Sequence, residues 1–181
     1  MADVLSKGEG AMGIVKTKRA LVVGCGEFGL AVADKLSSLG CAVTVVDMNA
    51  AAFNGLPASF GGETLVGDGA DVSTLEACEI DRASYFVACT TRDSVNYFIA
   101  RVASEVYGVE HVYARIDDGD LVAMLEDSTI EPICPHALCL GAFCRIANLP
   151  LDQRTPRAMS ESRGGWTGGR SVRGFGWKRE S

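Results

Sequence analysis

The stretch ALVVGCGEFGLAVADKLSSLGCAVTVVD, residues 20–47, sets a glycine-rich loop between an apolar run and a helical pattern, and it ends a second apolar run on an acid. A GxGxxG hexamer alone is a weak signal, because glycine-rich hexamers occur by chance in many chains. Here a predicted strand precedes the hexamer, a predicted helix follows it, and Asp47 closes the next strand, which is the context that a dinucleotide-binding loop needs.

Each glycine of this loop has its own physical reason. Gly24 permits the tight turn from strand to helix, Gly26 lets the backbone approach a pyrophosphate, and Gly29 lets the helix pack close to the strand. Asp47 is placed to accept hydrogen bonds from a ribose diol, and its charge would repel a 2′-phosphate, which favours NAD(H) over NADP(H). A tight turn with a capping acid and no ligand remains the alternative.

The rest of the chain repeats the alternation of strand and helix. We expect strands at 20–23, 42–46, 63–66, 85–89, 111–116 and 132–134, and helices at 27–39, 49–55, 72–78, 93–107, 119–126 and 136–147. Continuous apolar strands that alternate with helices are typical of a parallel sheet covered on both faces. The sequence therefore predicts an α/β fold, a Rossmann-like doubly wound sheet of six parallel strands with helices on both faces.

The 181 residues divide into a flexible leader, 1–18, a nucleotide-binding domain, 19–149, and a tail, 150–181. No apolar run is long enough to cross a bilayer and no secretory signal is recognised, so we expect a cytoplasmic protein. Residues 152–181 contain seven Lys or Arg and three acids, so this segment is basic. The rest of the chain therefore carries a larger net negative charge than the total of −6. An acidic domain argues against nucleic acid as its ligand.

The tail holds both tryptophans among glycine and arginine, a composition that does not fold alone. Its role stays open between a disordered solubilising end, a segment that touches a membrane surface or a transporter, and an RNA-binding segment.

The seven cysteines form no CxxC pair, which favours reduced thiols buried in a core. Cys134, Cys139 and Cys144 recur every five residues and drift around a helix, so core packing is favoured over a metal or redox set, and no metal site is predicted. His111 and His136 have no evident acid partner, which favours packing or capping over catalysis. No catalytic residue is therefore assigned.

Six motifs carry a resemblance to a known family: VVGCGEFG, VVD at 45–47, LVGDGAD at 65–71, ACTTRDSVN at 88–96, VYARIDD at 112–118 and EPICP at 131–135. Over about residues 18–147 the chain resembles the TrkA-N, KTN or RCK N-terminal domains, which are nucleotide-binding regulatory domains of potassium transporters and channels. The GD after the third strand, the T-x-D-x-x-N series and the AR of the fifth strand point to this family in particular.

The resemblance implies that Asp68 lies near the adenine and its ribose, with Gly67 and Gly69 opening the backbone around the base. A helix start with Asp68 or Asp71 as N-cap is the alternative for this segment, and both can hold at once. Thr90 and Thr91 follow the fourth strand on the ligand side of the sheet, where helix capping is again an alternative.

Arg115 stands on an otherwise apolar strand, where an unpaired guanidinium is rare. The resemblance implies that it reaches the phosphates, and an ion pair with Asp68 or Asp117 is the alternative. Glu27 replaces a basic residue found in some ATP-binding members, and a carboxylate beside a triphosphate is unfavourable. We therefore rank NAD(H) first, ADP or AMP next and ATP last, while Glu27 can equally be a solvated first-turn acid.

The predicted cofactor site comprises Gly24, Cys25, Gly26, Glu27, Phe28, Gly29, Asp47, Met48, Asp68, Gly69, Thr90 and Arg115. We expect binding without turnover, in a regulatory subunit that gates an integral-membrane potassium transporter and sits in the cytoplasm or on the inner face of the membrane. A homodimer or larger homo-oligomer is expected through Val95, Phe98, Ile99 and Val102, or through Leu138, Leu140, Phe143 and Ile146, which can also be core. The alternative function is a small NAD-dependent oxidoreductase that completes its site by oligomerising.

Overall fold

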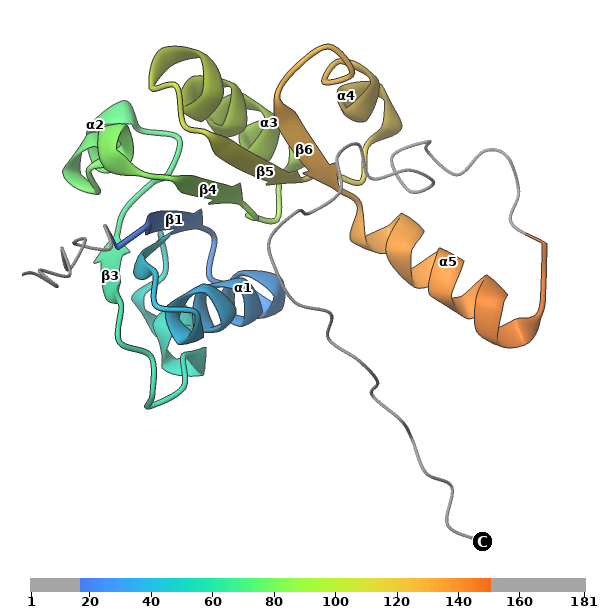
Figure 1. The fold of residues 1–181 in the computed structure, drawn as a ribbon, viewed down its shortest axis with the longest axis horizontal. Helices are drawn as coiled ribbons and strands as arrows, with labels where there is room; N and C mark the ends of the chain where they lie inside the picture. Colours follow the sequence, from blue (N-terminus) through green and yellow to red (C-terminus); the bar gives the residue numbers. More distant parts are fainter. Residues whose placement is uncertain (1–16, 151–181) are drawn as a thin grey trace, which may run out of the picture.

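A computed structural model of the chain describes residues 17–150, so most of the expected leader and tail, residues 1–16 and 151–181, lie outside the described residues. Six parallel strands form one sheet in the order β3-β2-β1-β4-β5-β6 (Figure 1). The strands are β1 (Arg19–Val23), β2 (Ala42–Asp47), β3 (Glu63–Val66), β4 (Tyr85–Ala88), β5 (His111–Arg115) and β6 (Ile130–Ile133). This doubly wound order confirms the predicted fold class.

The α-helices α1 (Glu27–Ser38), α2 (Val72–Ala77), α3 (Asp93–Arg101) and α4 (Gly119–Ala123) lie between strands, and α5 (Pro135–Ala147) follows the last strand. Two 3₁₀ turns, η1 (Ala50–Gly55) and η2 (Ile80–Arg82), and the π-helical segment η3 (Val102–Val106) complete the elements. The helix expected at 93–107 is thus α3 continued by a π segment, and the helix expected at 119–126 is shorter.

The last strand begins two residues earlier than expected and contains Pro132 in its interior. Proline cannot donate a hydrogen bond to a neighbouring strand, which makes it rare inside a central strand. Among the described strands, only β5 pairs with β6, and an edge strand tolerates proline because the nitrogen that lacks a donor can face away from the partner strand.

Two apolar cores lie on opposite faces of the sheet. Alternate residues of β1 divide between them, since Leu21 packs with residues of α2 and α3 while Val22 packs with residues of α1. Phe86 and Ile99 are fully buried in the first core, and Ala33 of α1 is fully buried in the second. Burial on both faces explains why the strands read as continuous apolar runs.

Helix α5 leaves the end of β6 and runs away from the sheet (Figure 1). Ala137 and Cys144 are buried, whereas Leu138, Leu140, Phe143 and Ile146 are exposed, Ile146 by 87%. Of the two stripes considered from the sequence, the α5 stripe is therefore exposed, whereas the α3 stripe is divided, with Ile99 in the core and Phe98 exposed. Within residues 17–150, no helix is both long and apolar enough to cross a bilayer.

The direction of winding changes between β1 and β4, and the turn from β1 into α1 lies at this point. Gly24 has a φ of +106°, and a Cβ there would lie 2.6 Å from the carbonyl oxygen of Cys89. A Cβ on Gly29 would collide with the carbonyl oxygen of Gly24. The fold itself therefore requires glycine at both positions.

We expect Gly29→Ala to lower the free energy of unfolding by about 1–3 kcal/mol, the usual cost of forcing an atom into a packed contact. Gly119→Ala is the matched control, because Gly119 is also helical and its Cβ would meet open space. Urea unfolding of the two variants measures the difference. Equal stability of both would contradict the close contact between α1 and the β1 turn.

Candidate functional site

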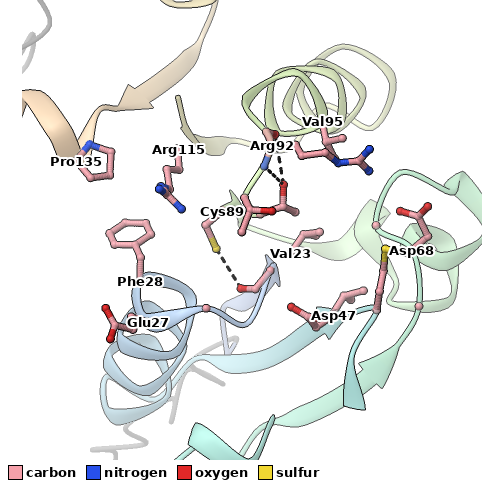
Figure 2. A pocket seen from close by; sticks show the side chains of 18 residues that line it. Val23, Glu27, Phe28, Asp47, Asp68, Cys89, Arg92, Val95, Arg115 and Pro135 are labelled. Atoms are coloured by element: carbon pink, nitrogen blue, oxygen red, sulfur yellow. Dashed lines mark hydrogen bonds between the residues drawn. The ribbon is translucent and has the colours of Figure 1, made fainter. Parts of the chain in front are cut away.

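A crevice of about 560 Å³ opens at the carboxyl ends of the central strands (Figure 2). Every predicted site residue except Cys25 and Gly29 lines it. The lining is completed by Val23, Val46, Gly67, Cys89, Thr91, Arg92, Val95 and Pro135. The position agrees with the general rule that open parallel sheets bind ligands where the strand order reverses. Val95, considered for an oligomer surface, thus faces the crevice.

Helix α1 begins on this crevice, and no side chain among residues 17–150 caps its amides. Its N-cap, Gly26, has an ordinary extended backbone with φ −76°, and a Cβ there would meet no described atom within 4 Å. Glu27 and Phe28, the first residues of the helix, also line the crevice. An uncapped helix start with open space before it is suited to bind an anion.

The carboxylate of Asp47 ties the glycine-rich loop to the end of β2. Its Oδ2 accepts a hydrogen bond from the amide of Cys25 at 2.7 Å, and its Oδ1 accepts one from the amide of Asn49 at 2.8 Å. The N-cap of η1 is Asn49, whose side chain accepts from the amide of Ala51 at 3.0 Å. Asp47 therefore holds the loop in addition to lining the crevice beside Met48.

In the GDGAD segment, the sequence left open whether the acids face a ligand or cap a helix, and the structure gives these positions to different residues. Asp68 lines the crevice and accepts a hydrogen bond from the amide of Ala70 at 2.9 Å, whereas Asp71 is the N-cap of α2. A Cβ on Gly69 would run into the side chain of Val23. Glycine at position 69 is thus required by packing against β1, apart from any contact with a base.

Thr90 is held by a residue to which the sequence reasoning gave no role. Asn96 accepts hydrogen bonds from the amide of Thr90 at 2.9 Å and from its hydroxyl at 2.7 Å, and it donates to the carbonyl oxygen of Arg115 at 2.8 Å. The N-cap of α3 is Arg92, whose amide donates to the Thr90 hydroxyl at 3.2 Å, so Thr91 is not the cap. The only sequence signal for Asn96 was its place in the T-x-D-x-x-N series.

The guanidinium of Arg115 enters the crevice at the end near Phe28 and Pro135 (Figure 2). Its Nη2 lies 3.8 Å from Oδ2 of Asp117, so of the two partners considered for an ion pair the structure selects Asp117 over Asp68. Among the described residues, Nε of Arg115 is a buried nitrogen without a hydrogen-bond partner. A buried donor without a partner is costly and fits a site whose acceptor comes from a ligand.

The end of β5 is also tied to α3 and α5. Oδ2 of Asp93 accepts hydrogen bonds from the amides of Asp117 and Asp118, each at 2.8 Å. Oδ1 of Asp117 accepts from the amide of His136 at 3.0 Å and from the thiol of Cys134 at 3.3 Å. His136 thus contacts an acid through its main chain, at the start of α5.

The second histidine lies at the opposite end of β5 and is engaged in packing. The ring of His111 stacks on Tyr85 with ring centroids 4.9 Å apart, and its Nε2 lies 3.6 Å from a carboxylate oxygen of Glu110. Glu110 is an acid neighbour that the sequence reasoning did not recognise. His111 does not line the crevice.

Two thiols pack around the turn of the glycine-rich loop. Cys89 donates to the carbonyl oxygen of Gly24 at 3.2 Å, and burial raises the pKa of its thiol to about 12. Burial also raises the pKa of Cys25, and the nearby Asp47 carboxylate adds to this shift. Both thiols stay protonated near neutral pH, so they pack and donate and are not nucleophiles.

The evenly spaced cysteine trio is divided between core and surface. Cys134 and Cys144 are buried, as expected for core packing, whereas Cys139 is exposed on α5. In the part of the chain that the structure describes, no group of three or more His, Cys, Asp or Glu residues is arranged to hold a metal ion.

Comparison with solved structures agrees with this architecture. The TrkA-N domain of the inner membrane protein ybaL from Escherichia coli superposes with a TM-score of 0.63 at 16% identity, covering 74% of this chain and 98% of that one. The Kef C-terminal domain of Shewanella denitrificans, in an AMP-bound form, superposes with a TM-score of 0.56 at 20% identity, covering 72% of this chain and 82% of that one. At these identities the likeness establishes the fold.

Sequence comparison identifies the family. The Trk system potassium uptake protein TrkA of Streptomyces coelicolor is 42% identical over 98 residues, which are 54% of this chain and 44% of that protein. The chain spans less than half the length of the curated relatives it matches. Residues 20–134 match the model of the TrkA-N domain. The chain therefore belongs to the TrkA-N domain family.

Proposed function

We propose that this chain is a regulatory domain that binds NAD(H) or an adenine nucleotide and thereby controls a membrane potassium transporter. The observation that carries the proposal is the open space at Gly26. The fold requires glycine at Gly24 and Gly29, but nothing in the described protein occupies the place of a Cβ on Gly26. A ligand phosphate that approaches the backbone is the physical reason for glycine at this position.

The lining of the crevice supports a definite order of ligand groups. The phosphates would lie between Gly26 at the start of α1 and the guanidinium of Arg115, whose Nε lacks a partner among residues 17–150. Asp47 would accept the ribose hydroxyls, and Met48 and Asp68 would face the adenine. The Kef domain that shares this fold was solved in an AMP-bound form, which supports an adenine nucleotide as the ligand.

We rank NAD(H) first, ADP or AMP second and ATP last. Glu27 lines the crevice at the first turn of α1, so a third phosphate there would face a carboxylate unless a cation intervened. Binding without turnover is proposed because the described lining includes no histidine and the thiol of Cys89, with its raised pKa, is protonated. The crevice gives no support to the oxidoreductase alternative.

The proposed partner is an integral-membrane potassium transporter subunit, approached from the cytoplasm. The support is the family and the name of the Streptomyces coelicolor relative, a Trk system potassium uptake protein. The exposed apolar residues of α5 support a homodimer or larger homo-oligomer, because a monomer gains nothing by presenting four large apolar side chains to water.

Asp117 supplies a contact between the crevice and this helix. Its Oδ2 faces Arg115 at 3.8 Å, while its Oδ1 holds the amide of His136 in the first turn of α5. A phosphate that binds Arg115 would compete with Asp117 for the guanidinium. A ligand shifts a conformational equilibrium only by its difference in affinity for the two states, and this shared carboxylate is where such a difference would arise.

We expect Gly26→Ala to weaken binding of NADH and ADP by about tenfold or more, because the methyl group removes charge-assisted contacts with the phosphates. The free energy of unfolding should fall by no more than about 1 kcal/mol, since the methyl group meets open space and only the preference for glycine over alanine at an N-cap is lost. Calorimetric titration and urea unfolding measure the two effects. Gly119→Ala serves again as the control and should leave affinity unchanged, whereas unchanged affinity in Gly26→Ala would remove the basis of the proposal.

We expect Asp47→Asn to reduce the preference for NADH over NADPH by about tenfold, because the carboxylate both accepts from the ribose and repels a 2′-phosphate. The substituted amide retains one oxygen acceptor for the loop, which Asp47→Ala would not. Titration of both variants with both nucleotides separates the two roles of Asp47. An unchanged preference in Asp47→Asn would mean that the carboxylate serves only the amides of Cys25 and Asn49.

We expect Ile146→Asp to halve the molar mass in solution by breaking a dimer formed through α5. The side chain is 87% exposed, so the substitution should not disturb folding of the protomer. Met124→Asp is the matched control, since Met124 is also an exposed large apolar residue and lies outside α5. Sedimentation equilibrium measures the mass. A monomeric parent protein, or an unchanged oligomer in the variant, would contradict an α5 interface.

A further inference from the structure

Asn96 is the one fully buried polar or charged side chain in the described part of the chain. It lies on α3 within the apolar core between this helix and the sheet, near the fully buried Ile99 and Ala100. Burying an amide is unfavourable unless its hydrogen bonds are replaced. An apolar side chain at this position would have no hydrogen bonds of its own to replace. The presence of an amide here therefore has to be explained by what it binds.

The amide of Asn96 is completely satisfied by the ends of two neighbouring strands. Its Nδ2 donates to the carbonyl oxygens of Thr90 at 3.1 Å and Arg115 at 2.8 Å. Its Oδ1 accepts from the amide of Thr90 at 2.9 Å and from the Thr90 hydroxyl at 2.7 Å. One side chain therefore joins the segment after β4 to the last residue of β5, and both segments line the crevice.

A second residue of α3 continues this attachment beyond β5. Asp93, one helical turn before Asn96, accepts from the amides of Asp117 and Asp118. Helix α3 thus fixes the main chain at Arg115, Asp117 and Asp118. Of the two, Asn96 is the one that bonds directly to the main chain of Arg115.

The side chain of Arg115 is restrained much less than its main chain. Its guanidinium approaches Asp117 only to 3.8 Å, and its Nε has no partner among residues 17–150. The main chain fixes the point from which a long side chain starts, and its φ and ψ restrict which rotamers the side chain can adopt. Holding that main chain reduces the ordering that a phosphate must impose when it binds.

We propose that Asn96 is a positioning residue for phosphate recognition, acting through Arg115. The inference rests on the proposed function, because it assumes that Arg115 meets the phosphates of a bound nucleotide. Asn96 itself touches no ligand and is enclosed in the core. Three of its four hydrogen bonds go to Thr90, which also lines the crevice, so the effect that runs through Arg115 has to be isolated with a second substitution.

The test is a double-mutant cycle of Asn96→Leu and Arg115→Ala, with ADP and adenosine as the titrated ligands. Leu has the same branching and number of side-chain heavy atoms as Asn, so it occupies the place of the side chain, while the groups of Thr90 and Arg115 that bond to Asn96 lose their partner. We expect Asn96→Leu to weaken ADP binding by about tenfold when Arg115 is present and by less than about twofold in Arg115→Ala, the non-additivity expected of coupled residues. Affinity for adenosine should stay within about twofold in every variant.

Two further variants separate positioning from general stability. Ile99→Ala removes apolar packing from the same helix, so it should lower the unfolding temperature and leave the ratio of ADP to adenosine affinity unchanged. Asn96→Ser is smaller and provides a hydroxyl for Thr90, and it replaces Asn96→Leu in the cycle if the leucine variant does not fold.

The outcomes distinguish this inference from the proposed function. If Asn96→Leu weakens ADP by the same factor with and without Arg115, or weakens adenosine as much as ADP, Asn96 is a structural residue only and the nucleotide site stands. If neither ADP nor NADH binds the parent protein, the proposed function fails and the positioning role fails with it.

Discussion

The contact between the β1 turn and the end of β4 is the constraint on which the rest of the structure depends. Gly24 lies so close to the main chain of Cys89 and Thr90 that no Cβ fits, and the Cys89 thiol donates to the Gly24 carbonyl oxygen. Because the turn is this tight, α1 starts immediately above the sheet and its uncapped end opens on the crevice. Gly29 extends the same contact into α1, so the separation of α1 from the β1 turn is set by backbone atoms.

Most of the fold could be predicted because its signals are local. Strands buried on both faces are continuous apolar runs, and β1, β2 and β3 begin and end within one residue of the expected positions. The errors lie where tertiary context decides. Pro132 is accepted inside β6 only because β6 is an edge strand, and an apolar pattern does not distinguish the π segment η3 from a continued α-helix. Periodicity likewise left the surface of α5 undecided, since an exposed stripe and a core stripe have the same spacing.

Some residues of the candidate site could likewise be recognised from local sequence, and others depend on tertiary structure. Residues that line the crevice through a motif, such as Asp47, Asp68 and Arg115, could be named from the sequence. Asn96 and Asp93 could not be given roles, because each bonds to main-chain groups brought near by the pairing of β4 with β5. Asp117 could be named as a partner of Arg115, but its bond to the amide of His136 at the start of α5 could not. A main-chain amide or carbonyl carries no sequence signal of its own. The partner of such a side chain becomes visible only when the strands are placed side by side.

The three glycines of the glycine-rich loop do not have the same physical role. Gly24 and Gly29 are needed by the fold, whereas Gly26 faces open space in the crevice. Asp47 already holds the loop through the amide of Cys25, but a carboxylate has about four acceptor positions and uses only two here. Under the proposed function, ribose hydroxyls would be accepted without breaking the bond that shapes the loop. Part of the ordering cost of binding would then be met in folding, which is what preorganisation means.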